Sequence, residues 1–92
     1  MKLAWNPLAL DDRGQILDYI AQDNPQAALE LDELIEKKAD QLIENPTLYR
    51  AGRKRGTREM VVHPNYIVIY RILAKTETIE ILRVKHAAQQ WP

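Results

Sequence analysis

Several polar side chains in the second half of the chain could together cleave RNA without a metal ion. In such a reaction a ribose 2′-hydroxyl attacks the neighbouring phosphate. One group must accept a proton, another must donate a proton to the leaving oxygen, and cations must hold the developing charge. An imidazole or a phenol can move protons, and guanidinium and ammonium groups can hold a phosphate. The side chains of suitable chemistry are Lys54, Arg58, Tyr66, Arg83 and His86.

These residues also have structural interpretations. Tyr66 lies in an apolar segment, where a tyrosine commonly contributes to a sheet face. Arg83 can cap a half-buried strand while its charged end stays in water. His63 comes directly before Pro64 and is expected to end a strand. The sequence therefore permits this catalysis without requiring it.

The residues needed for other common chemistries are missing. The chain has two histidines and no cysteine, and His63 and His86 do not have the helical spacing of metal ligands. Gly52 and Gly56 flank a basic loop instead of opening a helix after a strand, so they do not predict a phosphate-binding loop. A Gly-x-Ser-x-Gly nucleophile motif is absent. We therefore predict no cofactor and no metal site.

The segment from Tyr49 to Met60, YRAGRKRGTREM, concentrates positive charge in a chain whose formal net charge is zero. Residues 1–49 carry four bases and ten acids, whereas residues 50–92 carry nine bases and three acids. A solvated loop is one interpretation of the segment. We favour a binding role, because no acid lies among the bases to neutralise them. The five bases are Arg50, Arg53, Lys54, Arg55 and Arg58.

The first half of the chain predicts two helices. Asn is a favoured N-cap and Pro suits the first helical turn, so the Asn-Pro pairs at residues 6–7 and 24–25 each predict a helix start. The pair at residues 45–46 predicts a stop. Apolar residues at helical spacing then place the helices over about residues 7–22 and 25–44. The short link between them predicts an antiparallel hairpin.

The second half of the chain predicts strands. The segments on either side of Pro64-Asn65 are rich in β-branched and aromatic residues, which favours two antiparallel strands joined by a tight turn. TIEILRV, residues 78–84, predicts a third strand, and KLAW near the N-terminus a short further one. We expect a single α+β domain over residues 1–92. Its N-terminal antiparallel helical hairpin should cover one face of an antiparallel sheet of three to four strands, in the order β-α-α-β-β-β.

The predicted middle strand is apolar on both faces. Tyr66 and Val68 alternate with Ile67 and Ile69, so neither face of the sheet can remain fully exposed to water there. The helical hairpin can cover only one face. We expect the C-terminal tail with Trp91 to fold over part of the other face and a partner chain to cover the rest.

Length and composition predict an ordinary globular domain. The chain has 92 residues, of which 46% are hydrophobic and 28% charged, as in a single domain with a modest core. Asp11 and Asp12 follow the N-terminus too soon for a signal peptide, and no apolar run is long enough to span a membrane. The lack of cysteine suits a reducing compartment, so we expect a cytoplasmic protein.

Two segments carry a family resemblance. GTREMVVHPNYIVIYRI (residues 56–72) and IEILRVKHAAQQWP (residues 79–92) resemble the C-terminal half of the RelE/ParE superfamily of bacterial toxins. The shared features are a Gly-x-Arg-Glu strand, a His-Pro-x-Tyr turn and a final His-Ala-x-x-Gln-aromatic-Pro. The predicted order of helices and strands is also that of the superfamily. The resemblance implies the toxin of a type II toxin–antitoxin pair, which a small acidic antitoxin wraps in a complex that represses its own operon.

The resemblance also implies partners. We expect a hetero-oligomer with a cognate antitoxin, and contact with operator DNA only through that antitoxin. A two-sided apolar sheet beside a basic surface suits an acidic amphipathic segment, which would bury apolar area and pair its charges. The residues expected to bind partners are Arg50, Arg53, Lys54, Arg55, Arg58, Tyr66 and Trp91.

The superfamily divides by target. RelE-like members cut mRNA in the ribosome, whereas ParE-like members block DNA gyrase and have no known active site. The nuclease branch typically has an arginine after the turn tyrosine and a basic residue after the last strand, where this chain has Ile67 and the pair Ala87-Ala88. Both departures remove cations that would stabilise a cleaved phosphate, so we favour a ParE-like gyrase inhibitor.

One alternative is a ribosome-dependent mRNA endonuclease that uses His86, Arg58 and Arg83. Another is a non-toxic remnant that only binds an antitoxin.

Overall fold

The first half of the chain forms a short strand and a helical hairpin. In the computed structural model, which describes residues 1–89, these elements are β1 (Lys2–Trp5), α1 (Pro7–Asp23) and α2 (Pro25–Gln41). The Asn6 side-chain oxygen accepts a hydrogen bond from the Leu8 N–H, and the Asn24 oxygen accepts one from the Ala27 N–H. Both predicted helix starts are therefore confirmed.

The second helix is shorter than predicted. It ends at Gln41, whereas the apolar pattern placed its end at residue 44. The N–H groups of Ile43 and Glu44 donate to the carbonyls of Asp40 and Gln41, three residues back, so the chain tightens into turns before Pro46. The apolar pattern gives no sign that the helix ends at Gln41, because Leu42 is still buried in the core.

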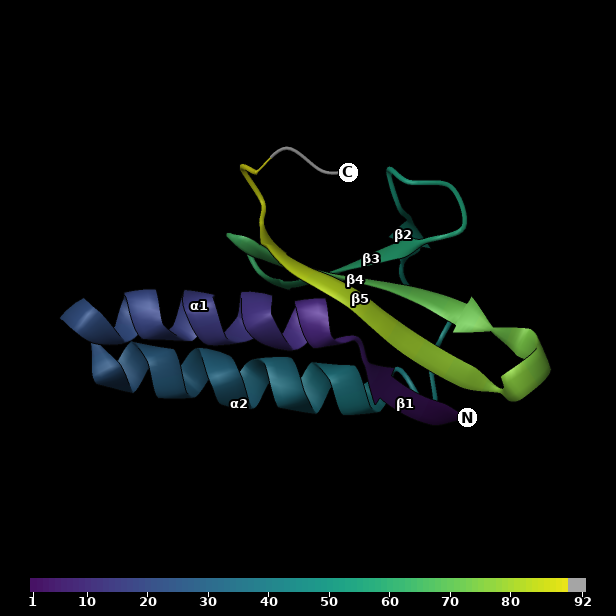
Figure 1. The fold of residues 1–92 in the computed structure, drawn as a ribbon, viewed down its shortest axis with the longest axis horizontal. Helices are drawn as coiled ribbons and strands as arrows, with labels where there is room; N and C mark the ends of the chain where they lie inside the picture. The colour runs from purple at the N-terminus through teal and green to yellow at the C-terminus, as the bar shows by residue number, and fades with distance from the viewer. Residues whose placement is uncertain (90–92) are drawn as a thin grey trace.

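The second half supplies most of the sheet. Its elements are β2 (Arg50–Ala51), β3 (Arg58–His63), β4 (Tyr66–Leu73), the short 3-10 helix η1 (Ala74–Thr76) and β5 (Thr78–His86). The strands lie in the order β1-β5-β4-β3-β2. In Figure 1 both helices lie side by side beneath the sheet, and the β2–β3 loop and residues 87–89 after β5 lie above it. The predicted α+β class with a hairpin on one face is confirmed.

The sheet differs from the prediction in two details, because it has five strands and is mixed. β1 runs parallel to β5, with Leu3 opposite Ile79 and Trp5 opposite Ile81. A parallel neighbour requires a crossover connection, and the helical hairpin begins that crossover. β2 pairs with only Arg58 and Glu59 of β3. A two-residue strand inside a basic segment has no alternation that sequence reasoning could detect.

The main core lies between the helices and the sheet. Its fully buried side chains include Ile35 of α2, Met60 of β3 and Tyr70 of β4. The Tyr70 hydroxyl donates to the Pro46 carbonyl at 2.7 Å and so anchors the chain that follows α2. Burial raises the pKa of Tyr70 above its ordinary value of 10.0, and the nearby Arg58 only partly opposes this, so the phenol remains a donor.

β4 is buried on its other face as well. Val68 and Tyr70 belong to the main core, so the alternating Ile67 and Ile69 point to the opposite side of the sheet. They are nevertheless only 2% and 0% exposed. The chain therefore covers this face itself at these two residues, so a partner could cover only what lies beyond them. Trp91, expected to help cover it, lies outside the described residues.

Asp12 fastens α1 to β5. One carboxylate oxygen accepts from Arg83 Nε at 2.7 Å and from the Val84 N–H at 3.0 Å, and the other accepts from Arg83 Nη2 at 2.9 Å. β1 pairs with β5 only over residues 78–81, so Asp12 satisfies a strand N–H beyond the end of that pairing. Burial opposes the ionisation of Asp12, but these hydrogen bonds outweigh it and lower the pKa of the carboxyl below 3.8.

Arg13 fastens α1 to α2. Its guanidinium lies 2.7 Å from Asp32 and 2.9 Å from Glu36, and it stacks 4.9 Å from the centre of the Trp5 ring. The Arg13 side chain is only 14% exposed, which limits the screening of these charges by water. Arg13, one of four bases in the acidic residues 1–49, therefore joins the two helices of this half to each other.

Replacing Asp12 with Asn should lower the free energy of unfolding at neutral pH by about 2 kcal/mol, because charge-assisted hydrogen bonds are lost. Since the folded-state pKa is depressed, the contribution of Asp12 is present above its unfolded value near 3.8 and is lost as the pH falls through the folded value. Urea unfolding of both proteins should show their difference shrinking below about pH 4. A difference that stays constant down to about pH 2.5 would contradict this linkage.

Replacing Gly14 with Ala should stabilise α1. A Cβ at Gly14 would meet no heavy atom within 4 Å, so the change removes a helix penalty of about 1 kcal/mol without a clash. The melting temperature should rise by roughly 4–8 °C in a domain of this size. Differential scanning calorimetry measures the rise, with Gly14→Ser as a control that should gain less. A lower melting temperature for the Ala variant would contradict the open environment of Gly14.

Candidate functional site

The basic stretch forms a loop that Glu59 holds against the sheet. Glu59 is 2% exposed. Its Oε1 accepts from Arg50 Nη2 at 3.1 Å, and its Oε2 accepts from the Arg53 backbone N–H at 2.9 Å and lies 3.6 Å from Arg53 Nε. The expectation that nothing local neutralises this stretch is therefore wrong. The first acid after the run of bases pairs with two of them.

The two arginines expected to act in catalysis are bound to their own chain. Arg58 Nη1 donates to the carbonyls of Tyr49 at 2.8 Å and Thr47 at 3.3 Å. Arg83 is held by Asp12, and this carboxylate raises the pKa of the guanidinium further. Both arginines therefore connect separate parts of the fold.

Tyr66 lies between the two histidines at one end of the sheet. Its ring centre is 5.9 Å from that of His63 and 5.2 Å from that of His86, which it meets edge-on at 84°. His63 Nδ1 accepts from the Asn65 N–H at 3.1 Å, and His86 Nδ1 accepts from the Ala88 N–H at 3.0 Å. With Nδ1 as an acceptor, each neutral ring carries its proton on Nε2.

The predicted catalytic set does not converge. His86 is opposite Tyr66, whereas Arg83 is opposite Ile69 and Arg58 is opposite Tyr70. At about 3.3 Å per residue, Ile69 and Tyr70 lie roughly 10 Å and 13 Å along β4 from Tyr66. Tyr66 and His86 are in ring contact, whereas the strand register places Arg58 and Arg83 away from them.

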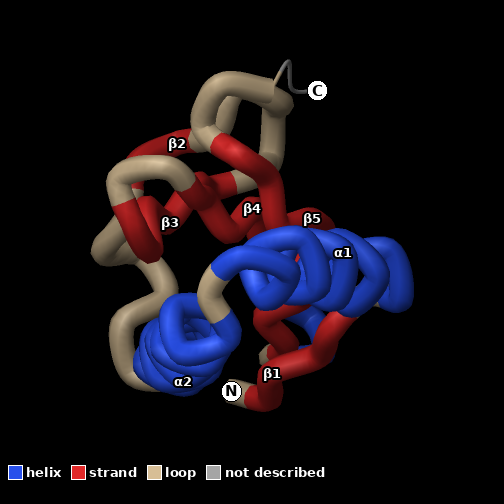
Figure 2. The backbone as a smooth tube through the Cα atoms, turned by 90° about the vertical axis from the view of Figure 1, so that its left-hand side faces the viewer, coloured by secondary structure: helices blue, strands red, loops and turns tan. Residues whose placement is uncertain are grey.

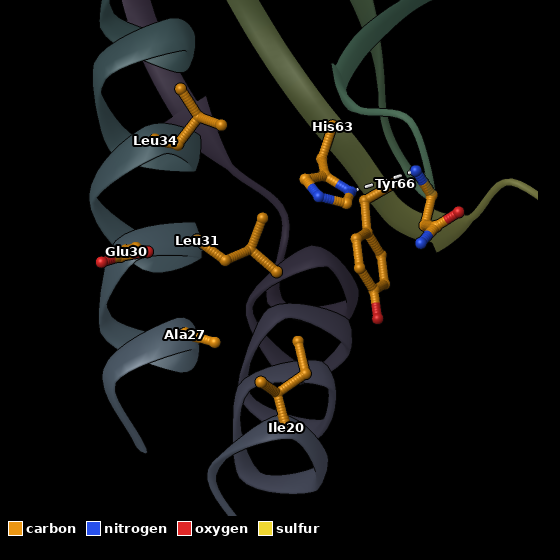
Figure 3. A pocket seen from close by; sticks show the side chains of 8 residues that line it. Ile20, Ala27, Glu30, Leu31, Leu34, His63 and Tyr66 are labelled. Atoms are coloured by element: carbon orange, nitrogen blue, oxygen red, sulfur yellow. Dashed lines mark hydrogen bonds between the residues drawn. The ribbon is translucent and has the colours of Figure 1, made fainter. Parts of the chain in front are cut away.

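A groove of about 400 Å³ separates the helical hairpin from the β3–β4 turn. In Figure 3 the side chains of Ile20, Leu31 and Tyr66 point toward one another across it. Glu30 and Asn65 add polar groups to a mostly apolar lining. Such a groove suits the apolar side of a peptide segment. The lining residues are Ile20, Ala27, Glu30, Leu31, Leu34, His63, Asn65 and Tyr66.

Tyr66 also borders a second, smaller hollow of about 220 Å³. This hollow lies beside α1, and one of its walls is the ring of Tyr19, a residue that is 71% exposed. The Tyr66 side chain therefore forms a wall of both depressions. The residues around the second hollow are Gln15, Ile16, Tyr19, Tyr66, His86 and Gln89.

Sequence reasoning missed the helical side of the groove. Leu34 is part of the apolar pattern that predicts the second helix, and no prediction concerns Ala27; both residues are half-buried where α2 lines the groove. An apolar face wider than the sheet can cover is a signal that could have identified them. Asp12 gave no such signal, because it lies 71 residues from Arg83 in the chain.

The described residues offer neither a metal-ligand cluster nor a membrane-spanning helix. Within residues 1–89, no group of three or more His, Asp and Glu side chains is arranged to hold a metal ion. In the same part of the chain, neither helix has the length and apolar character needed to cross a membrane.

The sequence is similar to those of bacterial toxins. Residues 3–91 match the family described as ParE toxin of type II toxin-antitoxin system, parDE. Y4kP of Sinorhizobium fredii, described as a candidate toxin, is 40% identical over 92 residues, which cover 99% of this chain and 93% of that protein. Toxin RelE2 of Caulobacter vibrioides is 34% identical over 88 residues, with 96% and 97% of the two chains covered.

Solved structures share the fold. The chromosomal ParDE toxin–antitoxin system from P. aeruginosa gives a TM-score of 0.81 at 23% identity, covering 94% of this chain and 95% of that one. The intact E. coli RelBE complex gives 0.67 at 13% identity, with 96% and 98% covered. Since the family match spans nearly the whole sequence and two similar proteins are described as toxins, this chain belongs to the ParE toxin family of type II toxin–antitoxin systems.

Proposed function

We propose that this toxin inhibits DNA gyrase by binding it, without cleaving RNA, and that a cognate antitoxin holds it inactive in the cytoplasm. The observation that carries the proposal is the engagement of the candidate catalytic arginines. Arg58 donates to backbone carbonyls and Arg83 to Asp12, and neither lies beside His86. A ribonuclease without a metal ion needs cations at the same phosphate as its proton-transfer group.

Two positions that are basic in the nuclease branch support the same conclusion. Ile67 takes the place of an arginine and is 2% exposed, so this position offers a buried aliphatic side chain. Ala87 follows β5 where a basic residue is usual, and its N–H donates to the Asn65 carbonyl at 2.7 Å. Neither residue can stabilise a developing negative charge with its side chain.

The groove is the surface that we assign to the antitoxin. Several similar structures are toxin–antitoxin complexes, including RelBE of E. coli and RelBE2 of Mycobacterium tuberculosis. By analogy, an amphipathic segment of the antitoxin would place its apolar side against Ile20, Leu31 and Tyr66. The resulting complex would be a hetero-oligomer that contacts operator DNA through the antitoxin.

A ribosome-dependent mRNA endonuclease is the second candidate. It is favoured by the likeness to toxin RelE2 and by the contact of Tyr66 with His86. In that mechanism Tyr66 or His86 Nε2 would transfer protons, and the phosphate would need cations recruited from the ribosome or from Lys54 and Arg55.

Purified toxin should inhibit supercoiling by gyrase in vitro. His86→Ala is expected to inhibit as strongly as the wild type, because the proposed mechanism involves no proton transfer. The antitoxin-bound toxin should leave gyrase active, which provides the matched control. Full gyrase activity at a large excess of a toxin that still arrests growth would contradict the proposal.

Translated mRNA should remain uncut in the presence of the toxin. Primer extension on mRNA from cells that express the toxin alone detects such cuts. If cuts appeared and His86→Ala weakened them by about 100-fold or more, the endonuclease function would replace the proposed one. If expression without antitoxin neither arrested growth nor cut mRNA, the chain would be a non-toxic remnant that binds antitoxin.

A further inference from the structure

Glu59 is a buried carboxylate that lies outside the groove and holds the basic loop. It is 2% exposed, and both of its carboxylate oxygens bind the basic stretch, through Arg50 and Arg53. Burying a carboxylate is costly unless opposite charge and hydrogen bonds offset the loss of water. A loop that only had to be soluble would not need a buried carboxylate. The arrangement therefore indicates that the loop is held in one conformation for a function.

The loop is ordered internally as well. The Gly52 N–H donates to the Thr57 carbonyl at 2.8 Å, and the Thr57 hydroxyl donates to the Lys54 carbonyl at 2.6 Å. Gly56 has a φ of +81°, a conformation that glycine adopts readily. A Cβ on Gly52 would lie 2.2 Å from Thr57 Oγ1, so only glycine allows this close approach. The loop is therefore built to hold one conformation.

This order divides the five bases into two groups. Arg50, Arg53 and Arg58 are bound to Glu59 or to backbone carbonyls. Lys54 and Arg55 are exposed, and within residues 1–89 neither side chain makes a hydrogen bond or an ion pair. We call these two residues the cationic tip. The charge available to a partner is therefore concentrated on two adjacent side chains.

β3 connects the cationic tip to the groove. The strand begins at Arg58, directly after the loop, and ends at His63, which lines the groove. Its outer side is paired only at Arg58 and Glu59, so within the described chain the outer side of residues 60–63 has no neighbouring strand. In Figure 2 β3 lies above α2, and β2 lies above β3. The Lys38 ammonium donates to the Val61 carbonyl at 3.4 Å and protects this edge.

We propose that Glu59 positions the cationic tip as a second anchor for the segment that fills the groove, and that the anchor binds carboxylates of this segment. The inference rests on the proposed antitoxin role of the groove. From Arg58 to His63 the strand is roughly 17 Å long, which an extended chain spans with about five residues. The antitoxin should therefore carry two or more acidic residues about five to eight residues from the apolar residues that enter the groove.

The first test removes the tip. The double variant Lys54→Ser with Arg55→Ser should bind the cognate antitoxin roughly tenfold more weakly than the wild type at about 50 mM salt, and within about twofold of it at about 0.5 M salt. The control, Lys2→Ser with Lys75→Ser, removes equal charge from exposed residues outside the loop and should bind like the wild type. If both double variants bound equally weakly, the affinity would depend on the net charge of the toxin and not on the tip, which would overturn the proposal.

The second test separates position from charge. Glu59→Gln makes the loop more positive, so a mechanism based on net charge predicts tighter binding to an acidic partner. Positioning by Glu59 predicts binding weaker by roughly threefold, because the loop loses its fixed conformation. If Glu59→Gln fails to fold, Gly52→Ala replaces it in this test. It disturbs the same loop without changing the charge and should weaken binding by a similar factor. Unchanged or tighter binding by a folded variant would overturn the role of Glu59.

A charge exchange identifies the partner residues. Toxin with Lys54→Glu and Arg55→Glu should bind poorly and regain affinity for an antitoxin in which the matching acidic pair is changed to Lys. No recovery with any acidic pair at the expected spacing would show that the tip faces something else. If the wild-type toxin binds no antitoxin at all, the proposed function itself fails, whereas normal binding that ignores the tip refutes only this inference.

Discussion

The central strand β4 cannot be exposed to water on either face, and the arrangement of the other elements follows from this constraint. Ile67, Val68, Ile69 and Tyr70 are each at most 2% exposed. The helical hairpin covers the face that bears Val68 and Tyr70, and the chain itself also covers Ile67 and Ile69 on the other side. Burial on both faces is more often a property of parallel sheets between two helical layers. Here an antiparallel strand has one helical layer.

This constraint brings charged residues close to an apolar surface. Glu59 is opposite Ile69 in the sheet and is buried with it on the face away from the helices. A carboxylate in that position requires cations, and Arg50 and Arg53 supply them. The same balance joins α1 to β5 through Asp12 and Arg83. Asp12 with Arg83 thus joins an acid of the first half to a base of the second, whereas Glu59 binds two arginines of its own half. The positive charge that remains at the surface of residues 50–89 is therefore more localised than the sequence indicates.

Local signals were sufficient for the helix starts and the long strands. The Asn-Pro pairs mark both helix starts because capping and the proline ring act within a few residues. The roles of Arg58 and Arg83 could not be predicted in the same way. Between Ile69 and Tyr70 the pairing with β5 shifts by one residue, so alternation along β5 does not tell which side Arg83 faces. Its partner Asp12 comes from the far end of the chain. Long-range pairing of this kind leaves no trace in residue spacing.

Tyr66 and Lys54 illustrate why one toxin can need two separate kinds of contact. Tyr66 offers apolar area in a preformed groove, and burial of such area governs how slowly a complex dissociates. Lys54 offers charge on an ordered loop, and charge governs how fast partners meet and which partners are rejected. Because β3 fixes the distance between them, a partner must present apolar and acidic residues at one spacing to use both. In the proposed interaction, a rigid sheet between two anchors would select its partner by the pattern of the partner's residues, which neither an apolar groove nor a basic surface could do alone.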